Sequence, residues 1–125
     1  MKWLDRRIAW PGPFLALALT EADFIKCVRY LSATSEARFP TSGAKTEIFE
    51  KAGACPTCIV AMSEVAAARS PIEVAGLLVH EAVHVWQTYC DDLGEQKPGV
   101  EQEAYAIQAI SQSLWAEYVR QRKLT

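Results

Sequence analysis

The second half of the chain contains two long stretches in which apolar residues recur at helical spacing. The first opens with Ser70-Pro71-Ile72-Glu73, where a capping serine precedes a proline at the first helical position and an acid at the third. This pattern predicts a helix from Pro71 to about Tyr89 or Cys90. A loop rich in glycine and proline separates it from a last predicted helix over Val100–Arg122.

Shorter segments in the first half predict strands and one helix. Phe14–Leu19 is a continuous apolar run and is expected to be a buried strand. Thr20 is expected to cap a helix that runs to about Leu31, because an acid follows it three positions later, as in a capping box. Farther on, the residues that end in Glu47-Ile48-Phe49 predict an edge strand, and Cys58–Met62 predicts the second strand of a hairpin.

Length and charge narrow the possible classes. The length of 125 residues predicts one domain over residues 1–125, and 50% hydrophobic and 22% charged residues are typical of a globular protein. Together with the segments above, this predicts an α+β fold with about three strands and about three helices. The net charge is −2 and no basic stripe is interleaved with aromatic residues, so nucleic acid is not an expected partner. The longest apolar run, Ile8–Leu19, contains Pro-Gly-Pro and is too short to span a bilayer, so a membrane partner is not expected.

The start of the chain resembles a secretion signal in two respects. Lys2, Arg6 and Arg7 precede the apolar run, and Ala16-Leu17-Ala18 resembles a cleavage site. The Pro-Gly-Pro break and the helix cap at Thr20 instead favour a buried strand. The expected location is therefore the cytoplasm.

Four cysteines occur, at Cys27, Cys55, Cys58 and Cys90. Without a secretion signal they are expected to be thiols outside disulfides. Cys55 and Cys58 form a C-x-x-C pair, for which a local disulfide or a functional role in zinc binding or thiol exchange stays open. A structural zinc site would need two more ligands, and Cys27 and Cys90 are single residues far away in sequence.

The most informative motif is His80-Glu81-Ala82-Val83-His84, inside the first long predicted helix. Residues four apart share one face of a helix, so both imidazoles can converge on one metal ion. Glu81 borders that face and can take a proton from a water molecule. Two neutral nitrogens and such a carboxylate are what a catalytic zinc site requires. The chain has two histidines in all, and both are in this motif; two ordinary helix histidines are the plain alternative.

A catalytic zinc ion normally has a third protein ligand. Because both histidines are used, this ligand should be a carboxylate or a cysteine. Glu101 and Glu103 both lie at the start of the last predicted helix, which a short loop can fold back beside the first. The metal site is therefore expected between the last two helices, with either glutamate as the third ligand.

The motif, the short loop and Glu101-Gln102-Glu103-Ala104-Tyr105 together resemble the gluzincins, zinc peptidases whose third ligand is a glutamate. In gluzincins this ligand is the first glutamate of an E-x-x-A-D or E-x-x-x-D pattern. The resemblance therefore implies a small zincin-like fold with Zn²⁺ held by His80, His84 and Glu101.

The aspartate of the gluzincin pattern, which supports the first histidine ligand, is replaced here by Tyr105. Gln108, one turn further on, or a backbone carbonyl would have to support that histidine. The stretches from His80 to Gln87 and from Glu103 to Gln108 also resemble small proteins encoded by phages and prophages. For such a protein, the expected location is the cytoplasm of the host cell.

These residues predict a zinc metallopeptidase whose partner is a peptide or protein substrate. Glu81 would be the general base for attack on the peptide carbonyl and would return the proton to the leaving amine. Tyr105 is the first candidate to stabilise the developing oxyanion and Tyr89 the second, and either could equally be a core aromatic. The substrate is expected to lie extended along an edge strand within Ala44–Met62.

A non-catalytic function competes with this hypothesis. The metal could join two helices in a latent or regulatory binding module, and residues Met1–Pro13 could lie in the cleft of a self-inhibited form. Glu81 favours catalysis, because a purely structural metal site does not need it.

Overall fold

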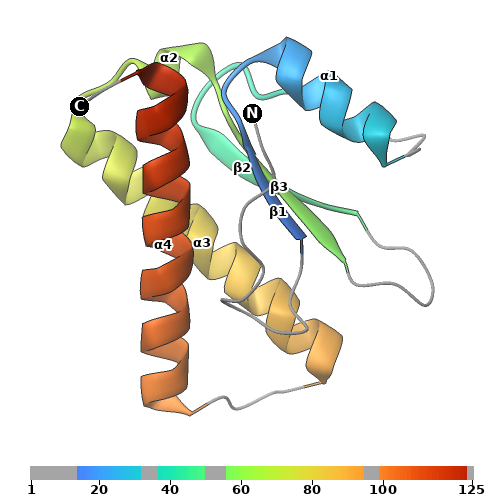
Figure 1. Cartoon of the computed structure of the whole chain (residues 1–125), viewed down its shortest axis with the longest axis vertical. Coiled ribbons are helices and arrows are strands. Elements are labelled where there is room, and N and C mark those ends of the chain that lie inside the picture. The colour runs from blue at the N-terminus through green and yellow to red at the C-terminus, as the bar shows by residue number, and fades with distance from the viewer. Residues whose placement is uncertain (1–13, 32–36, 50–55, 95–98, 124–125) are drawn as a thin grey trace.

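The computed structural model describes residues 14–31, 37–49, 56–94 (without the side chains of 92 and 93) and 99–123 (Figure 1). These residues form an α+β fold with a three-stranded sheet and four helices, which agrees with the expected class. The elements in chain order are β1 (Phe14–Ala18), α1 (Glu21–Tyr30), β2 (Ala44–Phe49), β3 (Thr57–Met62), α2 (Glu64–Ala67), α3 (Pro71–Leu93) and α4 (Val100–Arg122).

The strands of the sheet are ordered β1-β3-β2, so β2 forms one edge. β2 and β3 are antiparallel, with Thr46 opposite Val60. This confirms the predicted edge strand and the predicted pairing of the hairpin strands, whereas the connection between them, residues 50–55, lies outside the described residues. β1 pairs with β3 in parallel, with Ala16 opposite Ile59, and the sequence pattern does not specify this pairing.

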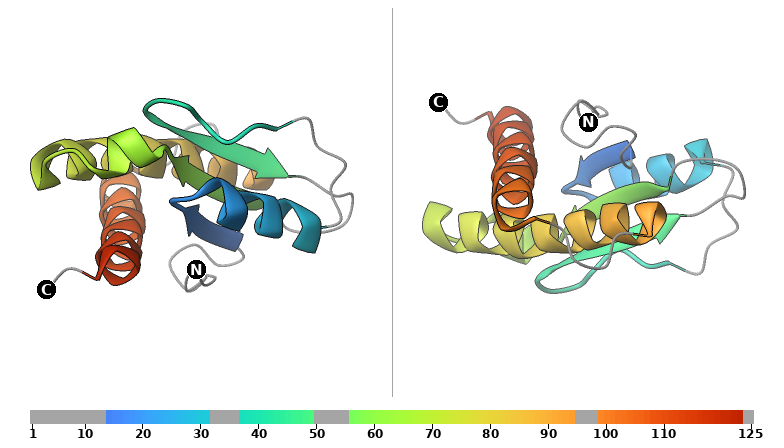
Figure 2. Two further views of the ribbon diagram at one scale, coloured as in Figure 1. Left: turned by 90° about the horizontal axis from the view of Figure 1, so that it is seen from above. Right: turned by 90° about the horizontal axis from the view of Figure 1, so that it is seen from below.

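Alternate residues of the strands are buried on opposite faces of the sheet, as the two-residue period of a strand requires. Leu15, Leu17 and Val60 pack in a cluster with residues of α2, α3 and α4. Ala16 and Ile59 pack in a second cluster, with residues of α1. The sheet therefore lies between α1 on one side and α3 with α4 on the other (Figure 2).

Side-chain caps explain where the helices begin. The Thr20 hydroxyl accepts a hydrogen bond from the Asp23 backbone N–H at 3.1 Å, at the start of α1. The Ser70 hydroxyl accepts from the Glu73 backbone N–H at 3.4 Å and donates to the Glu73 carboxylate at 2.8 Å. Both predicted helix starts are confirmed, and each cap satisfies a backbone donor that the helix leaves unpaired.

The ends of the two long helices differ in how well the sequence predicts them. α3 continues past the predicted end at Tyr89 or Cys90 to Leu93, where Gly94 has a φ of 70°. Glycine adopts this left-handed conformation at little cost and commonly ends helices. α4 covers the predicted range, Val100–Arg122.

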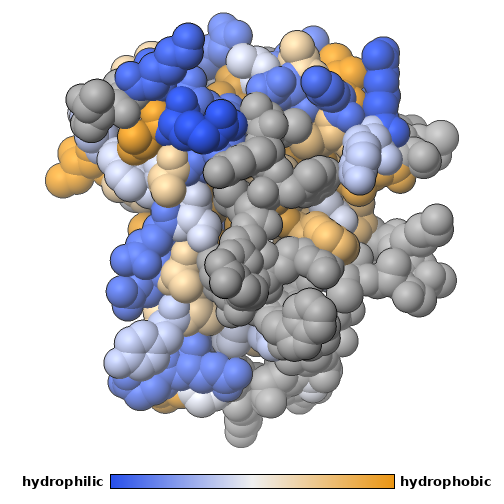
Figure 3. Space-filling view, viewed as in Figure 1, coloured by the Kyte–Doolittle hydropathy of each residue, from blue (hydrophilic) through white to orange (hydrophobic). Residues whose placement is uncertain are grey.

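In the part of the chain that the structure describes, no helix is both long enough and apolar enough to cross a bilayer. The side of α4 seen in Figure 3 is mostly hydrophilic. The arm Met1–Pro13 lies outside the described residues, so the structure does not bear on the self-inhibited form.

Candidate functional site

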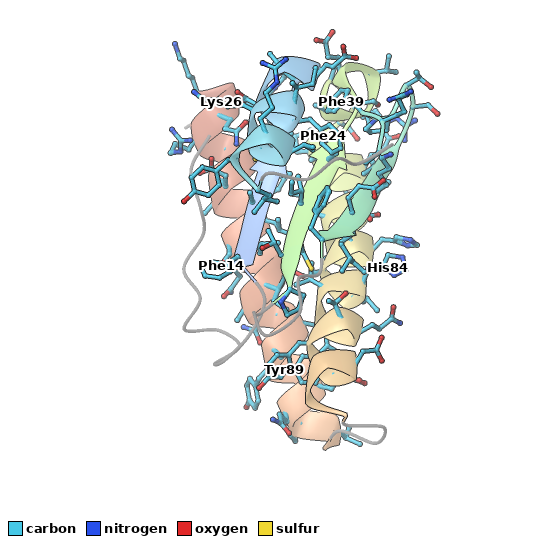
Figure 4. All side chains as sticks on the ribbon, turned by 90° about the vertical axis from the view of Figure 1, so that its right-hand side faces the viewer. Phe14, Phe24, Lys26, Phe39, His84 and Tyr89 are labelled. Carbon is cyan, nitrogen blue, oxygen red and sulfur yellow. The ribbon has the colours of Figure 1, made fainter. Side chains whose placement is uncertain are left out.

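His80 and His84 lie side by side on the exposed face of α3. Their ring centroids are 5.0 Å apart, and the ring planes are inclined at 73°. The His80 side chain is 68% exposed, and His84 points outward from α3 on the side of β2 (Figure 4). The spacing of four residues brings the rings together because it is close to one helical turn.

Glu81, in contrast to the two histidines, is buried, and its side chain is only 3% exposed. The Thr46 hydroxyl, on β2, donates a hydrogen bond to Oε1 of Glu81 at 2.9 Å. The other carboxylate oxygen, Oε2, lies 4.0 Å from Nε2 of His80. The buried acid is thus fixed by the sheet on one side and faces a histidine on the other.

The motif borders a pocket between α3 and the edge strand β2. The pocket has a volume of about 350 Å³ and is lined by Ala44, Lys45, Thr46, Ile48, His80, Glu81, His84, Gln87, Thr88 and Asp91. Every lining residue belongs to β2 or α3. The sequence predicts the three motif residues of this pocket but not the strand side chains that face them.

Two further residues of α3 hold His84. Nδ1 of His84 lies 3.0 Å from Oε1 of Gln87, which accepts the ring N–H and so leaves Nε2 available for a ligand. The Thr88 hydroxyl donates to the backbone carbonyl of His84 at 3.0 Å. Gln87 was not predicted to support the site, although its place three residues after His84 puts it on the same helix face.

The glutamates of α4 do not join the histidine pair. Oε2 of Glu103 accepts a hydrogen bond from the indole N–H of Trp86 at 2.8 Å, and Glu101 is exposed. Trp86 is two residues after His84, which is roughly 200° further round a helix with 3.6 residues per turn. α4 therefore packs on a different side of α3 from the one that carries the imidazoles.

The histidines line a pocket with β2 rather than one with α4, and the metal site expected between the last two helices stays a prediction. Among the described residues, no group of three or more His, Cys, Asp or Glu side chains is arranged to hold a metal ion. Two imidazole donors are brought together, and Glu101 as the third ligand stays a prediction.

The other residues predicted to assist the site also lie elsewhere. Tyr105 is 68% exposed on α4 and does not line the pocket. Tyr89 is buried in the core, where its ring centroid is 5.2 Å from that of Trp86. Gln108 is exposed on α4. Cys55 lies outside the described residues, so the structure does not test the C-x-x-C pair.

A second polar cluster lies at the opposite end of α4. The fully buried Glu117 carboxylate accepts hydrogen bonds from Nε and Nη2 of Arg120 at 2.8 and 2.6 Å. The hydrogen bond to Glu117 raises the pKa of Arg120. Gln121 donates both to Glu117 at 2.7 Å and to the Leu17 carbonyl at 2.8 Å, so the cluster joins α4 to β1.

The chain was compared with known protein families, curated proteins and solved structures. No protein-family model, curated protein or solved structure matches the chain. A function for the chain therefore has to be inferred from the pocket between α3 and β2.

Proposed function

We propose that the chain is a zinc-dependent peptidase whose active site is the pocket between α3 and β2. The observation that carries the proposal is the juxtaposition of two exposed imidazoles, 5.0 Å apart, with a buried carboxylate beside them. A buried acid with a fixed orientation is costly to maintain, and such groups are concentrated at functional sites.

The side chains fit part of a zinc site. His80 and His84 would each supply one nitrogen. Glu101 of α4 is the proposed carboxylate ligand, which would require the start of α4 to move toward the side of α3 that carries the histidines. When bound, zinc would supply a Lewis acid that polarises the carbonyl of a peptide. The hydrogen bond from Nδ1 of His84 to Gln87 would orient that ring, as outer hydrogen bonds to metal-ligating histidines generally do.

Glu81 would perform the proton transfers. Its Oε2 faces the histidines and would accept a proton from the water that attacks the peptide carbonyl. The same oxygen would then give the proton to the leaving amine. Oε1 would stay bonded to Thr46 throughout.

The edge strand β2 would guide the substrate. Ala44, Thr46 and Ile48 line the pocket, and β2 has β3 on one side only. An extended peptide could therefore add to the outer edge of β2 through main-chain hydrogen bonds. This would place the scissile bond beside the histidines without a deep side-chain pocket.

The proposal is tested by metal analysis and by one substitution. Protein purified without chelators should contain about one zinc ion per chain and should cleave an unfolded protein such as reduced casein. Glu81→Gln should retain zinc and lose hydrolysis, whereas Glu21→Gln, on the exposed start of α1, should retain both. A wild-type chain that binds no zinc at micromolar concentration would refute the proposal.

One observation favours a second candidate, a metal-binding module without peptidase activity. Glu103 is engaged by Trp86 and does not lie with the histidines, so the site as described has two ligands on one helix. In that case zinc should bind to the wild type and to Glu81→Gln alike, and neither protein should hydrolyse the unfolded substrate.

A further inference from the structure

We infer that Thr46 is the positioning residue of the general base, Glu81. Its hydroxyl binds one carboxylate oxygen, so that the other oxygen faces the histidines and can transfer protons. The inference rests on the proposed peptidase function and extends it to a residue outside the metal motif. It depends on three observations: the burial of Glu81, the bond from Thr46, and the place of Thr46 on β2.

The burial of Glu81 makes its hydrogen-bond partner important. A carboxylate with 3% exposure has lost nearly all contact with water, and a buried charge is tolerated only where polar groups replace that water. The Thr46 hydroxyl lies 2.9 Å from Oε1 and 3.5 Å from the backbone carbonyl of Glu81. The hydroxyl donates to Oε1, the nearer of these two acceptors.

The two carboxylate oxygens therefore differ. Oε1 is engaged by Thr46, while Oε2 points toward His80, 4.0 Å from its Nε2. The oxygen that faces the histidines is the one that can reach a water molecule in the pocket. Rotation of the carboxylate plane away from this orientation would break the bond to Thr46, so this bond keeps one of the two oxygens on the side of the substrate.

Thr46 also links the base to the strand that would bind the substrate. It lies in the middle of β2, opposite Val60, and its β-branched side chain has few rotamers. A peptide that adds to the edge of β2 would therefore meet a base whose position is set by the same strand. Thr46 would thus set the position of the base relative to the strand that binds the peptide.

The test compares Thr46→Val with Thr46→Ser. Valine keeps the branched shape and removes the donor, whereas serine keeps the donor. Thr57→Val, at a buried position of β3, is the matched control. We expect Thr46→Val to lower kcat roughly 10- to 100-fold, because a small misplacement of a catalytic group costs this much, with KM and zinc content unchanged. Thr46→Ser should restore most of kcat, and Thr57→Val should retain it.

A second measurement separates this inference from the proposed function. The midpoint of thermal unfolding is measured for Thr46→Val in the wild-type and Glu81→Met backgrounds; it should fall more in the first, where the bond exists. Active protein with an unchanged kcat in Thr46→Val would overturn the inference and leave the peptidase standing. A wild type without zinc or hydrolysis would overturn both, and non-additive midpoints would then show that the bond is structural only.

Discussion

Trp86 and Glu103 are joined by a hydrogen bond of 2.8 Å between the indole N–H and a carboxylate oxygen, and this bond ties the start of α4 to α3. Trp86 is 3% exposed. A buried indole N–H needs an acceptor, and Glu103 provides one. The bond therefore explains the position of Glu103 without a metal ion. Glu101 is then the glutamate in the first turn of α4 that is available to bind a metal ion.

This hydrogen bond predicts that Glu103 contributes to stability through Trp86, whereas Glu101 contributes to zinc binding. Trp86→Phe keeps an aromatic ring but removes the donor, so the free energy of unfolding should fall by about 1–3 kcal/mol, the cost of a partner left unsatisfied. Zinc affinity should not change. Glu101→Gln should leave stability unchanged and weaken zinc binding. Urea denaturation and titration with a fluorescent zinc chelator measure the two effects.

The reverse pattern would change the ligand assignment. If Glu103→Gln abolishes zinc binding and Glu101→Gln does not, then Glu103 exchanges Trp86 for the metal. Tryptophan fluorescence should in that case change when zinc is added to the wild type but not when it is added to Trp86→Phe.

Substitution of Gln87 should change zinc affinity, which can be measured without an assay of hydrolysis. Its Oε1 lies 3.0 Å from Nδ1 of His84, and loss of such a supporting acceptor typically lowers metal affinity about 10- to 100-fold. Gln87→Leu should therefore bind zinc more weakly than the wild type, whereas Gln87→Glu, which keeps an acceptor, should not. Equal affinities for wild type and Gln87→Leu would show that His84 is not a ligand.

Cys27 predicts how stability depends on pH. Burial, with a smaller effect of Asp23, raises the pKa of this thiol from 9.0 to about 11. Below pH 9 the thiol is protonated in both the folded and the unfolded chain, so its contribution to stability is complete. As the pH rises from about 9 to 11, the unfolded chain loses this proton and the folded chain keeps it, so the free energy of unfolding falls.

Urea denaturation at several pH values between 8 and 10.5 should show this fall. Cys27→Ala removes the titrating group and should start from a lower stability, because it leaves a cavity, but should decline less steeply with pH. An equal slope for the two proteins would contradict the assignment to Cys27.

The cluster at the end of α4 predicts an unequal effect of two arginines. Arg120 contacts the buried Glu117 through two hydrogen bonds, whereas Arg122 is exposed in the same turn. Arg120→Met should lower the midpoint of thermal unfolding more than Arg122→Met, because it removes the bidentate partner of a buried carboxylate. Calorimetry of both variants tests this, and equal midpoints would contradict it.

The sequence predicts local features of this fold well. The caps at Thr20 and Ser70 place two helix starts, and the four-residue spacing of the histidines places both rings on one face of α3. These features depend on neighbours within one helical turn, where spacing alone determines contact.

Features that depend on distant parts of the chain were not predicted. Thr46 reaches Glu81 across 35 positions, and no local signal pairs them. The parallel pairing of β1 with β3 has no local signal either. The pattern of α4 predicts its extent, but not the side of α3 on which it packs, where Glu103 accepts a hydrogen bond from Trp86. The sequence therefore identifies the helix that carries the histidines but not the pocket with β2 that they line.

The outward-facing imidazoles should also allow affinity purification of the chain without an added tag. Imidazole is a good ligand for copper and nickel as well as zinc, and the rings on α3 face solvent a single turn apart. The folded chain should be retained on a chelating resin charged with either ion and released by competing imidazole. Retention would depend on an intact helix, and so would report on folding during purification.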